Sequence, residues 1–347
     1  MTADRPAPPV ALCGAGMIAG AHAAAARLAG LPVVAVASRT AERAVAMAEG
    51  LGATAVEYAD LPAGAEIVVV ATPPGQHAGD ALRLLDAGAA VVLEKPLCRT
   101  LDEADRLVAA SDAHGGRLLY AENLAYAPLV QRLIGLTPKV GALTHVEVRS
   151  LQGLPGWGAF TTDEWGGGAL FDLGVHPLAV AMLVCGAAGL GRPTEVTAVL
   201  RGGAGHGSDE HAEVTLHYPG GHRATVVASW QAGPEPTWDI QVAGQDGVLR
   251  AELLPVQRLE YNGDEVALPT SNCPVPVLED LGYLPQLTAF VDDIAAGRAP
   301  VMDARFGRDV LQVVMAAYTS AGRGGAQESL PFAGSRHHTP LELWRDG

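Results

Sequence analysis

The chain has 347 residues, 49% hydrophobic and 18% charged, which is enough apolar material for the cores of two or three globular domains. Its 38 acidic residues outnumber 23 Lys and Arg, and no basic run offsets the formal charge of −15 locally, which argues against a nucleic-acid partner. Neither a signal-peptide pattern nor a membrane-length apolar run is present, so we expect a cytoplasmic protein with no membrane partner.

Short apolar runs alternate with helix-forming segments in the first third of the chain. The runs predicted as strands cover residues 9–13, 32–38, 66–73, 90–96 and 117–123. Such an alternation is typical of a parallel sheet covered by helices on both faces. We therefore predict an α/β, doubly wound Rossmann domain that binds a dinucleotide and covers residues 1–123.

The first turn of this domain reads GAGMIA, residues 14–19, between a strand and a helix. Gly14 permits a tight turn, Gly16 lets a pyrophosphate approach the backbone, and Ala19 allows close packing of the helix. An anion bound here would lie on the helix N-terminus. The pattern alone is weak, but its place after the first strand favours a dinucleotide.

The end of the second predicted strand distinguishes NAD from NADP. An acid at this point would hold the ribose hydroxyls of NAD and repel a 2′-phosphate. This chain instead has Ser38-Arg39-Thr40, with Arg43 one helical turn further on. Because a hydroxyl and two guanidinium groups suit a phosphate dianion, we predict NADP as the cofactor, with NAD possible. The alternative is that Arg39 only stacks on adenine or stays solvated.

Three further stretches occupy the ends of predicted strands: ATPPGQH at 71–77, EKP at 94–96 and AENLAYAP at 121–128. The second part of the chain contains the glycine-rich run GGGALFDLGVHPL at 166–178. Together with GAGMIA, this set resembles the family of glucose-fructose oxidoreductase and inositol 2-dehydrogenase. The similarity extends over nearly the whole chain, including LPQLTAFVDDIAAGRAP at 284–300.

The resemblance implies a nicotinamide-dependent enzyme in which Lys95 lies near nicotinamide and substrate, while Asp172 and His176 come from a helix of the second domain. It also implies a cis peptide bond before Pro96. The residues expected at the cofactor site are Gly14, Gly16, Met17, Ile18, Ser38, Arg39, Thr40, Arg43, Ala71, Thr72, Pro73, Pro74, His77, Glu94, Lys95 and Asn123.

The chemistry requires these residue types independently of the family, because a dinucleotide moves the hydride while the protein must move a proton and stabilise an alkoxide. We assign the proton to His176 and the substrate oxygen to Lys95. Asp172 can orient the imidazole or bind a neighbouring substrate hydroxyl, and Glu94 can brace Lys95 or its loop. The alternative for Asp172 and His176, which a spacing of four places on one face of a helix or strand, is a satisfied core pair.

One position departs from the inositol-type pattern. Members of that branch usually carry an acid three residues after the histidine, whereas this chain has Ala179. The HPL sequence at 176–178 looks more like the sugar-ketone reductase and dihydrodiol dehydrogenase branches, in which a tyrosine often stands at the histidine position. Inositol is therefore not the expected substrate.

After residue 123 the pattern changes to long alternating runs, which predict a large, mostly antiparallel open sheet. Helical segments at 167–185, 284–297 and 306–320 can cover one face of it. We therefore predict an α+β domain over residues 124–347 that binds substrate and mediates oligomerisation. The resemblance adds that the open face commonly pairs subunits, so we expect a homodimer or homotetramer.

Aromatic residues precede the glycine-rich run, and flat rings suit the C–H faces of sugars. Trp157, Phe160 and Trp165 can form a wall of the substrate pocket together with Tyr126; the alternative is a hydrophobic plug that closes the loop. The residues expected to contact substrate are Lys95, Tyr126, Trp157, Trp165, Asp172 and His176.

Residue types that often bind metals give no metal signature here. His206, His211, His217 and His222 lack an HExxH pattern or a cysteine-rich companion. The four cysteines lie far apart without a CxxC pair, which predicts reduced thiols. We expect no metal site.

We therefore predict an NADP-preferring oxidoreductase that moves a hydride to or from a secondary alcohol or ketone of a sugar, cyclitol or related polyhydroxylated metabolite. One alternative is a reductase of an imine, an enone or a dihydrodiol, since the same cofactor serves other acceptors. An alternative of a different class is a non-catalytic regulator that senses sugars or nucleotides. Such a regulator would be expected to lose catalytic residues, whereas Lys95, Asp172 and His176 are present.

Overall fold

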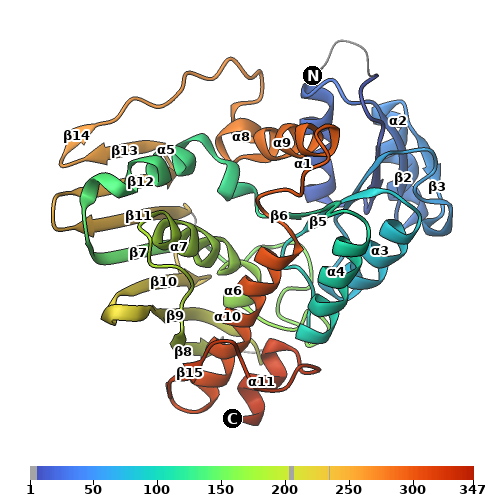
Figure 1. Ribbon diagram of the computed structural model, residues 1–347. Coiled ribbons are helices and arrows are strands. Elements are labelled where there is room, and N and C mark those ends of the chain that lie inside the picture. The colour runs from blue at the N-terminus through green and yellow to red at the C-terminus, as the bar shows by residue number, and fades with distance from the viewer. Residues whose placement is uncertain (1–5, 203–206, 234) are drawn as a thin grey trace. The chain divides into compact units, whose positions relative to one another are not determined.

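The computed structural model describes residues 6–202, 207–233 and 235–347 (Figure 1). His206, one of the histidines considered above as a metal ligand, lies outside these residues. The chain divides into two compact units. The first unit comprises the stretch up to Cys98 with Asp102–Tyr126 and Asn272–Arg308, and the second comprises Arg99–Leu101, Ala127–Ser271 and Asp309–Gly347.

The first unit contains a six-stranded parallel sheet in the order β3-β2-β1-β4-β5-β6, which confirms the predicted doubly wound fold. All residues of β1, β4, β5 and β6 are buried, because helices cover both faces, and this explains their uninterrupted apolar sequence. The pattern does not reveal β3, a partly exposed edge strand of three residues. The strands are β1 Val10–Cys13, β2 Val33–Ala37, β3 Thr54–Val56, β4 Ile67–Val70, β5 Ala90–Glu94 and β6 Leu118–Ala121.

The helices of this unit come from two separate parts of the chain, residues 17–126 and residues 276–295. Figure 1 shows α9 beside α1, far from it in sequence, and the two helices are in contact. The longer helices are α1 Met17–Leu28, α2 Ala41–Leu51, α3 Pro74–Asp86, α4 Leu101–Ala113 and α9 Tyr283–Ala295. The short ones are η1 Tyr58–Asp60, η2 Asn123–Tyr126 and α8 Pro276–Asp280.

The second unit contains a nine-stranded sheet in the order β14-β13-β12-β11-β7-β10-β9-β8-β15. Only β7 and β10 pair in parallel, so the predicted mostly antiparallel sheet is confirmed. The strands are β7 Leu143–Leu151, β8 Glu195–Gly202, β9 Asp209–His217, β10 Arg223–Ser229, β11 Thr237–Gly244, β12 Val248–Leu254, β13 Arg258–Tyr261, β14 Asp264–Glu265 and β15 Glu328–Ser329.

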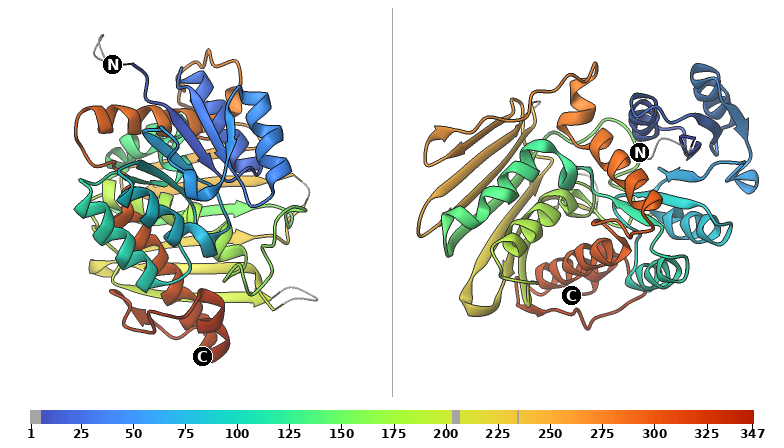
Figure 2. Two further views of the ribbon diagram at one scale, coloured as in Figure 1. Left: turned by 90° about the vertical axis from the view of Figure 1, so that its right-hand side faces the viewer. Right: turned by 45° about the horizontal axis from the view of Figure 1, so that its top comes forward.

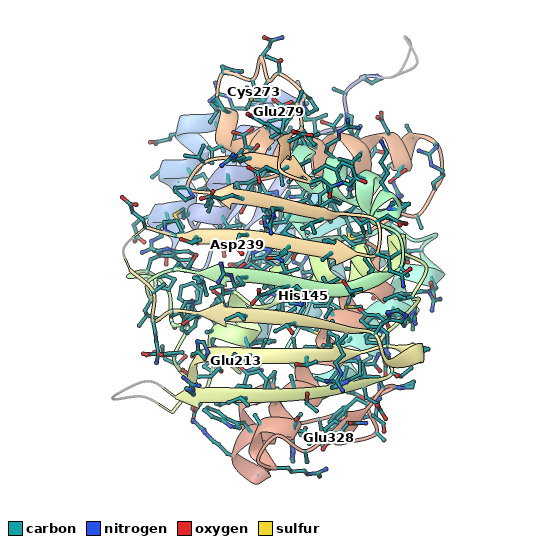
Figure 3. The ribbon with its side chains drawn as sticks, turned by 90° about the vertical axis from the view of Figure 1, so that its left-hand side faces the viewer. His145, Glu213, Asp239, Cys273, Glu279 and Glu328 are labelled. Carbon is teal, nitrogen blue, oxygen red and sulfur yellow. The ribbon has the colours of Figure 1, made fainter. Side chains whose placement is uncertain are left out.

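Helices cover one face of this sheet, as the right-hand view of Figure 2 shows for α5 and α7. Buried residues alternate with more exposed ones along β7 and β9, because only one face of the sheet is covered. The opposite face is open and carries polar side chains such as His145, Glu213 and Asp239 (Figure 3). The helices of this unit are α5 Pro128–Leu136, η3 Thr137–Val140, α6 Ala169–Asp172, α7 Val175–Ala187, η4 Pro219–Gly221, α10 Ala304–Gly322, whose first residues belong to the first unit, and α11 Pro340–Asp346.

All four cysteines are free thiols, three of them buried and Cys273 partly exposed. Among the residues that the structure describes, no helix combines the length and the apolar character needed to cross a membrane.

Candidate active site

The residues expected at the cofactor site all belong to the first unit. They follow the carboxyl ends of β1, β2, β4, β5 and β6, which are neighbouring strands of one parallel sheet. Ligands of doubly wound sheets bind outside this edge, because the strand-to-helix turns converge there. The sequence therefore located the loops that the topology brings to a common edge.

Gly14 occupies a position that only glycine tolerates. Its φ of +121° lies in a region that side chains disfavour, and an added Cβ would lie 2.6 Å from the carbonyl oxygen of Ala71. The Gly14 amide donates to the carbonyl oxygen of Ala37, at the end of β2. The Gly14 turn therefore packs closely between the ends of β2 and β4, which leaves no room for a side chain.

Gly16, unlike Gly14, has free space around the position of a Cβ. It is the N-cap of α1, no side chain of the described residues caps that helix end, and a Cβ added here would meet nothing within 4 Å. The start of this 12-residue helix thus has no side-chain cap within the described part of the chain, and Met17 beside it is exposed. A cradle of this kind fits a pyrophosphate, whose charge the helix N-terminus stabilises, so the residues present suit a dinucleotide.

The loop after β2 is held by a residue that the sequence analysis did not single out. The amide of Arg39 donates to the hydroxyl of Tyr58 in η1 at 3.1 Å, and the amide of Thr40 donates to Ser38 Oγ at 3.3 Å. Arg39 and Arg43 are exposed, and neither forms an ion pair within the described part of the chain. Both guanidinium groups are therefore available to an anion in solution.

A buried histidine–carboxylate pair adjoins Lys95 in the chain. His22 Nε2, on α1, donates to Glu94 Oε1 at 2.7 Å, and the Lys95 amide donates to Glu94 Oε2 at 3.0 Å. Burial alone would raise the pKa of the Glu94 carboxyl, but the hydrogen bond and charge of His22 and the charge of Lys95 lower it below its ordinary value. The edge of the His22 ring meets the Tyr283 ring at a centroid distance of 5.4 Å. Glu94 thus braces the Lys95 backbone.

His77 links the loop after β4 to the same turn. Its Nδ1 lies 2.8 Å from the carbonyl oxygen of Pro96 and its Nε2 lies 2.6 Å from that of Thr72. Burial lowers the pKa of His77, and a neutral imidazole donates through only one of these nitrogens. The Lys95–Pro96 peptide bond is cis, as the resemblance implies. The buried His77 therefore bridges two strand-end loops.

Two further expected residues lie at the end of β6, in η2. Asn123 is buried, and its side-chain amide donates to the carbonyl oxygen of Leu281 at 2.7 Å. Tyr126 is half-buried, and burial raises the pKa of its hydroxyl to about 12. Both belong to the first unit, whereas the other aromatic residues expected at the substrate belong to the second.

In the second unit, Asp172 and His176 lie on two helices rather than one. α6 ends at Asp172, α7 begins at Val175, and the Gly174 amide reaches back five residues to the carbonyl oxygen of Ala169. This widened turn corrects the expectation of a continuous helix over 167–185. It needs Gly174, whose added Cβ would lie 2.6 Å from a carbonyl oxygen of the preceding turn. Such widened turns are frequent at functional sites.

Both side chains are nearly enclosed, each with 6% of its surface exposed. The His176 ring lies against the indole of Trp238 on β11, with centroids 5.6 Å apart and planes inclined by 36°. The indole therefore limits the orientations that the imidazole can adopt. Nothing in the strand sequence distinguished Trp238 from a core aromatic residue.

The loop before the glycine-rich run contains the hydrophobic plug considered as the alternative for it. Phe160 is buried in a cluster with Ala169, Leu173 and Trp230, and Trp165 packs against that cluster. Trp157 is 47% exposed and meets Phe160 edge-on at 4.7 Å. Phe160 therefore acts as a hydrophobic plug, and Trp157 keeps a free aromatic surface.

The described histidines of the second sheet have separate partners. His211 bonds to Glu213 at 3.1 Å, His217 to Thr197 Oγ1 at 3.1 Å, and His222 to the carbonyl oxygen of Leu143 at 3.1 Å. Within the described residues, no group of three or more potential ligands has the arrangement of a metal site.

Comparison with known proteins identifies relatives for both halves of the chain. Over 165 residues, it is 33% identical to D-glucoside 3-dehydrogenase of Escherichia coli K12, an alignment that covers 45% of this chain and 47% of that protein. It is 31% identical over 229 residues to trans-1,2-dihydrobenzene-1,2-diol dehydrogenase of Oryctolagus cuniculus, covering 64% of this chain and 67% of that protein. The chain spans only 38 to 61% of the length of three of the curated relatives that it matches.

The fold also matches solved structures. The crystal structure of GenD2 from gentamicin A biosynthesis, in complex with NAD, superposes with a TM-score of 0.82 at 25% identity, covering 94% of this chain and 97% of that one. Residues 9–122 match the model of the oxidoreductase family with an NAD-binding Rossmann fold, and residues 137–250 match the GFO/IDH/MocA C-terminal domain. The chain therefore belongs to the GFO/IDH/MocA family of oxidoreductases, which confirms the resemblance inferred from its motifs.

Proposed function

We propose that the protein is an NADP-preferring oxidoreductase that transfers a hydride to or from a secondary alcohol or ketone of a sugar or related polyhydroxylated metabolite. The observation that carries this proposal is the convergence of buried Glu94, His22 and His77 on the backbone around Lys95. Such bracing limits the positions available to a lysine that must act on a substrate oxygen.

In this mechanism the bound nicotinamide cofactor supplies or accepts the hydride. Lys95 donates a hydrogen bond to the substrate oxygen and stabilises its negative charge. His176 exchanges the proton with that oxygen, and the neighbouring indole of Trp238 helps to hold its ring in place. Asp172 orients the imidazole or binds an adjacent substrate hydroxyl. Acid–base catalysis of this kind contributes about 10²- to 10⁴-fold to the rate.

The cofactor preference rests on the loop after β2. Ser38, Arg39 and Arg43 offer a hydroxyl and two exposed cations to a 2′-phosphate, and no acid stands where the ribose of NAD would need one. Titration of tryptophan fluorescence with NADPH and with NADH measures this preference directly. Replacement of Arg39 by Asp should change the ratio of the two affinities by about tenfold or more in favour of NADH. An unchanged ratio contradicts the assignment.

The relatives and the aromatic surfaces support the proposed substrate class. One relative is a D-glucoside 3-dehydrogenase, and exposed Trp157 and the Trp238–His176 contact offer flat faces that suit sugar C–H groups. A screen of sugars and their ketones with NADP and NADPH tests the class. The dihydrodiol dehydrogenase among the relatives, together with the HPL sequence, makes trans-dihydrodiols the second class to screen.

The variants Lys95→Ala and His176→Ala test the proposed roles of these two residues. Each variant should lose turnover by about 10²-fold or more while it still binds NADPH. Retained turnover in both variants would contradict the mechanism. Loss of NADPH binding in His176→Ala would contradict the assignment of that residue to proton transfer alone.

We also propose a homodimer or homotetramer formed through the open face of the nine-stranded sheet (Figure 3). The face carries ordered polar pairs, such as the two-pronged contact of Arg149 with Asp239 at 2.9 and 2.8 Å. Their order before association lowers the entropic cost of binding a second copy. A molar mass of one chain by light scattering, at micromolar concentration, contradicts this proposal.

A further inference from the structure

A buried carboxylate lies at the start of β9, where regular alternation would not place it. Glu213, Thr215 and His217 occupy the less buried face of β9, and the same parity would put Asp209 there too. The register between β8 and β9 shifts between Arg201 and Gly202, so that Asp209 and its neighbour face one residue of β8. The extra residue is a bulge, which turns the Asp209 side chain into the interior, where it is fully buried.

Asp209 binds the first turn of α6. Its Oδ2 accepts from the Leu170 amide at 2.8 Å, and its Oδ1 accepts from the hydroxyl of Tyr318 on α10 at 2.5 Å. The Tyr318 oxygen in turn accepts from the Gly168 amide at 2.9 Å. Two amides at the start of α6 are thus satisfied by residues that lie far away in sequence.

The backbone at this point has no room to move. A Cβ on Gly168 would lie 2.1 Å from the carbonyl oxygen of Asp209, and one on Gly167 would lie 2.3 Å from the Phe171 side chain. The glycine-rich run therefore lets α6 contact the backbone of β9 directly. Asp172 is two residues beyond Leu170 in the same helix, and the widened turn then leads to His176.

We propose that Asp209 and Tyr318 are positioning residues, which set the orientation of the segment that carries Asp172 and His176. The proposal rests on the proposed function of those two residues. Because α6 is only four residues long, its own hydrogen bonds cannot fix its direction, whereas the contacts from β9 and α10 do so at its first turn.

The energetics favour a functional reason for a carboxylate at this position. Burial raises the pKa of Asp209 to about 6 despite hydrogen bonds from Tyr318 and from backbone amides. The ionised side chain therefore costs stability near neutral pH, and a neutral residue of similar shape would pack at lower cost. Positions that carry such a cost are commonly tied to function.

The test compares Asp209→Asn, Asp209→Ala and Tyr318→Phe with two controls from the same unit, Asp264→Asn and Tyr261→Phe. Asp264 is exposed, and the Tyr261 hydroxyl bonds only a backbone oxygen on the protein surface. Turnover number, KM and NADPH affinity are measured for each variant, with circular dichroism as the check on folding. Uniformly labelled histidine allows the imidazole resonances of His176 to be followed by NMR, assigned with His176→Ala.

We expect Tyr318→Phe and Asp209→Ala to lower the turnover number by about tenfold or more with NADPH affinity unchanged, since misplacement of a catalytic group by about 1 Å can cost 10²-fold. The His176 resonances should shift in both variants and in neither control. Asp209→Asn keeps one acceptor for the Leu170 amide, so it should retain more turnover than Asp209→Ala. Should Asp209→Ala fail to fold, Asp209→Asn and Tyr318→Phe still test the proposal.

Two outcomes separate this inference from the proposed function. If His176→Ala abolishes turnover while Tyr318→Phe and Asp209→Asn keep wild-type turnover and unshifted His176 resonances, the positioning role is wrong and the function stands. If His176→Ala turns over normally, the proposed function of His176 is wrong, and the NMR comparison still decides whether Asp209 and Tyr318 fix its orientation.

Discussion

Lys95 and the Asp172–His176 segment are supported in two different ways. The residues that hold the Lys95 turn, Glu94, His77 and His22, all come from the first third of the chain. They lie in or next to the strand-end loops of a single parallel sheet, where topology brings successive loops together.

The supports of the second segment come from remote parts of the second unit. Asp209 on β9, Tyr318 on α10 and Trp238 on β11 contact the segment from three elements that are far apart in sequence. A Rossmann-type site can therefore be located from the strand ends of its sheet. A site mounted on an α+β sheet depends on tertiary contacts that carry no local pattern.

The glycines at the starts of α1 and α6 should respond to an added methyl group in opposite ways. Gly168→Ala should destabilise the second unit by about 3 kcal/mol or more, because its Cβ would overlap the backbone of β9. Gly16→Ala should change stability by about 1 kcal/mol or less but weaken dinucleotide binding, because its Cβ enters open space at the helix end. Urea unfolding and NADPH titration of both variants measure the contrast; equal losses of stability would refute it.

Removal of the Glu94 carboxylate tests whether it stabilises the turn that carries Lys95. Glu94→Ala leaves the buried His22 Nε2 and the Lys95 amide without their acceptor, so we expect a loss of about 3 kcal/mol in unfolding free energy. Glu49→Ala, on the exposed part of α2, is the matched control and should change it by about 0.5 kcal/mol or less. A small effect of Glu94→Ala would show that the ion pair does not brace the turn.

Asp209 should make the free energy of unfolding depend on pH. Its pKa is raised from 3.8 to about 6, so the folded protein binds this proton more tightly than the unfolded chain does. Its contribution to the free energy of unfolding should therefore increase as the pH falls from about 7 to about 4, by at most about 3 kcal/mol. The difference between wild type and Asp209→Asn, measured by urea unfolding at each pH, isolates this contribution. A difference that is constant with pH would contradict it.

The smallest expected effect concerns Tyr58. Tyr58→Phe removes the hydroxyl that accepts from the Arg39 amide, so we expect the NADPH-to-NADH affinity ratio to fall by about two- to fivefold through loosening of the loop. Tyr261→Phe serves as the control that loses a hydroxyl elsewhere. An unchanged ratio would show that the loop keeps its position without Tyr58.

Much of the fold could be predicted from the sequence, because buried parallel strands have uninterrupted apolar runs and half-covered strands alternate. The strand-end loops of the first unit could be located as well, since Gly14 and Lys95 directly follow strands. The break between α6 and α7 could not, because it depends on how closely Gly174 approaches the preceding turn. The inward direction of the Asp209 side chain could not be predicted either. A one-residue bulge reverses the alternation of buried and exposed residues on which such predictions rest.

The nine-stranded sheet ends on both sides in strands of only two residues, β14 and β15. The edge of a sheet is where another chain can add a strand through unpaired amide and carbonyl groups, and such addition leads to aggregation. A two-residue edge offers few of these groups. The sheet can therefore expose a broad face to a partner while its borders resist uncontrolled growth into larger β-structures.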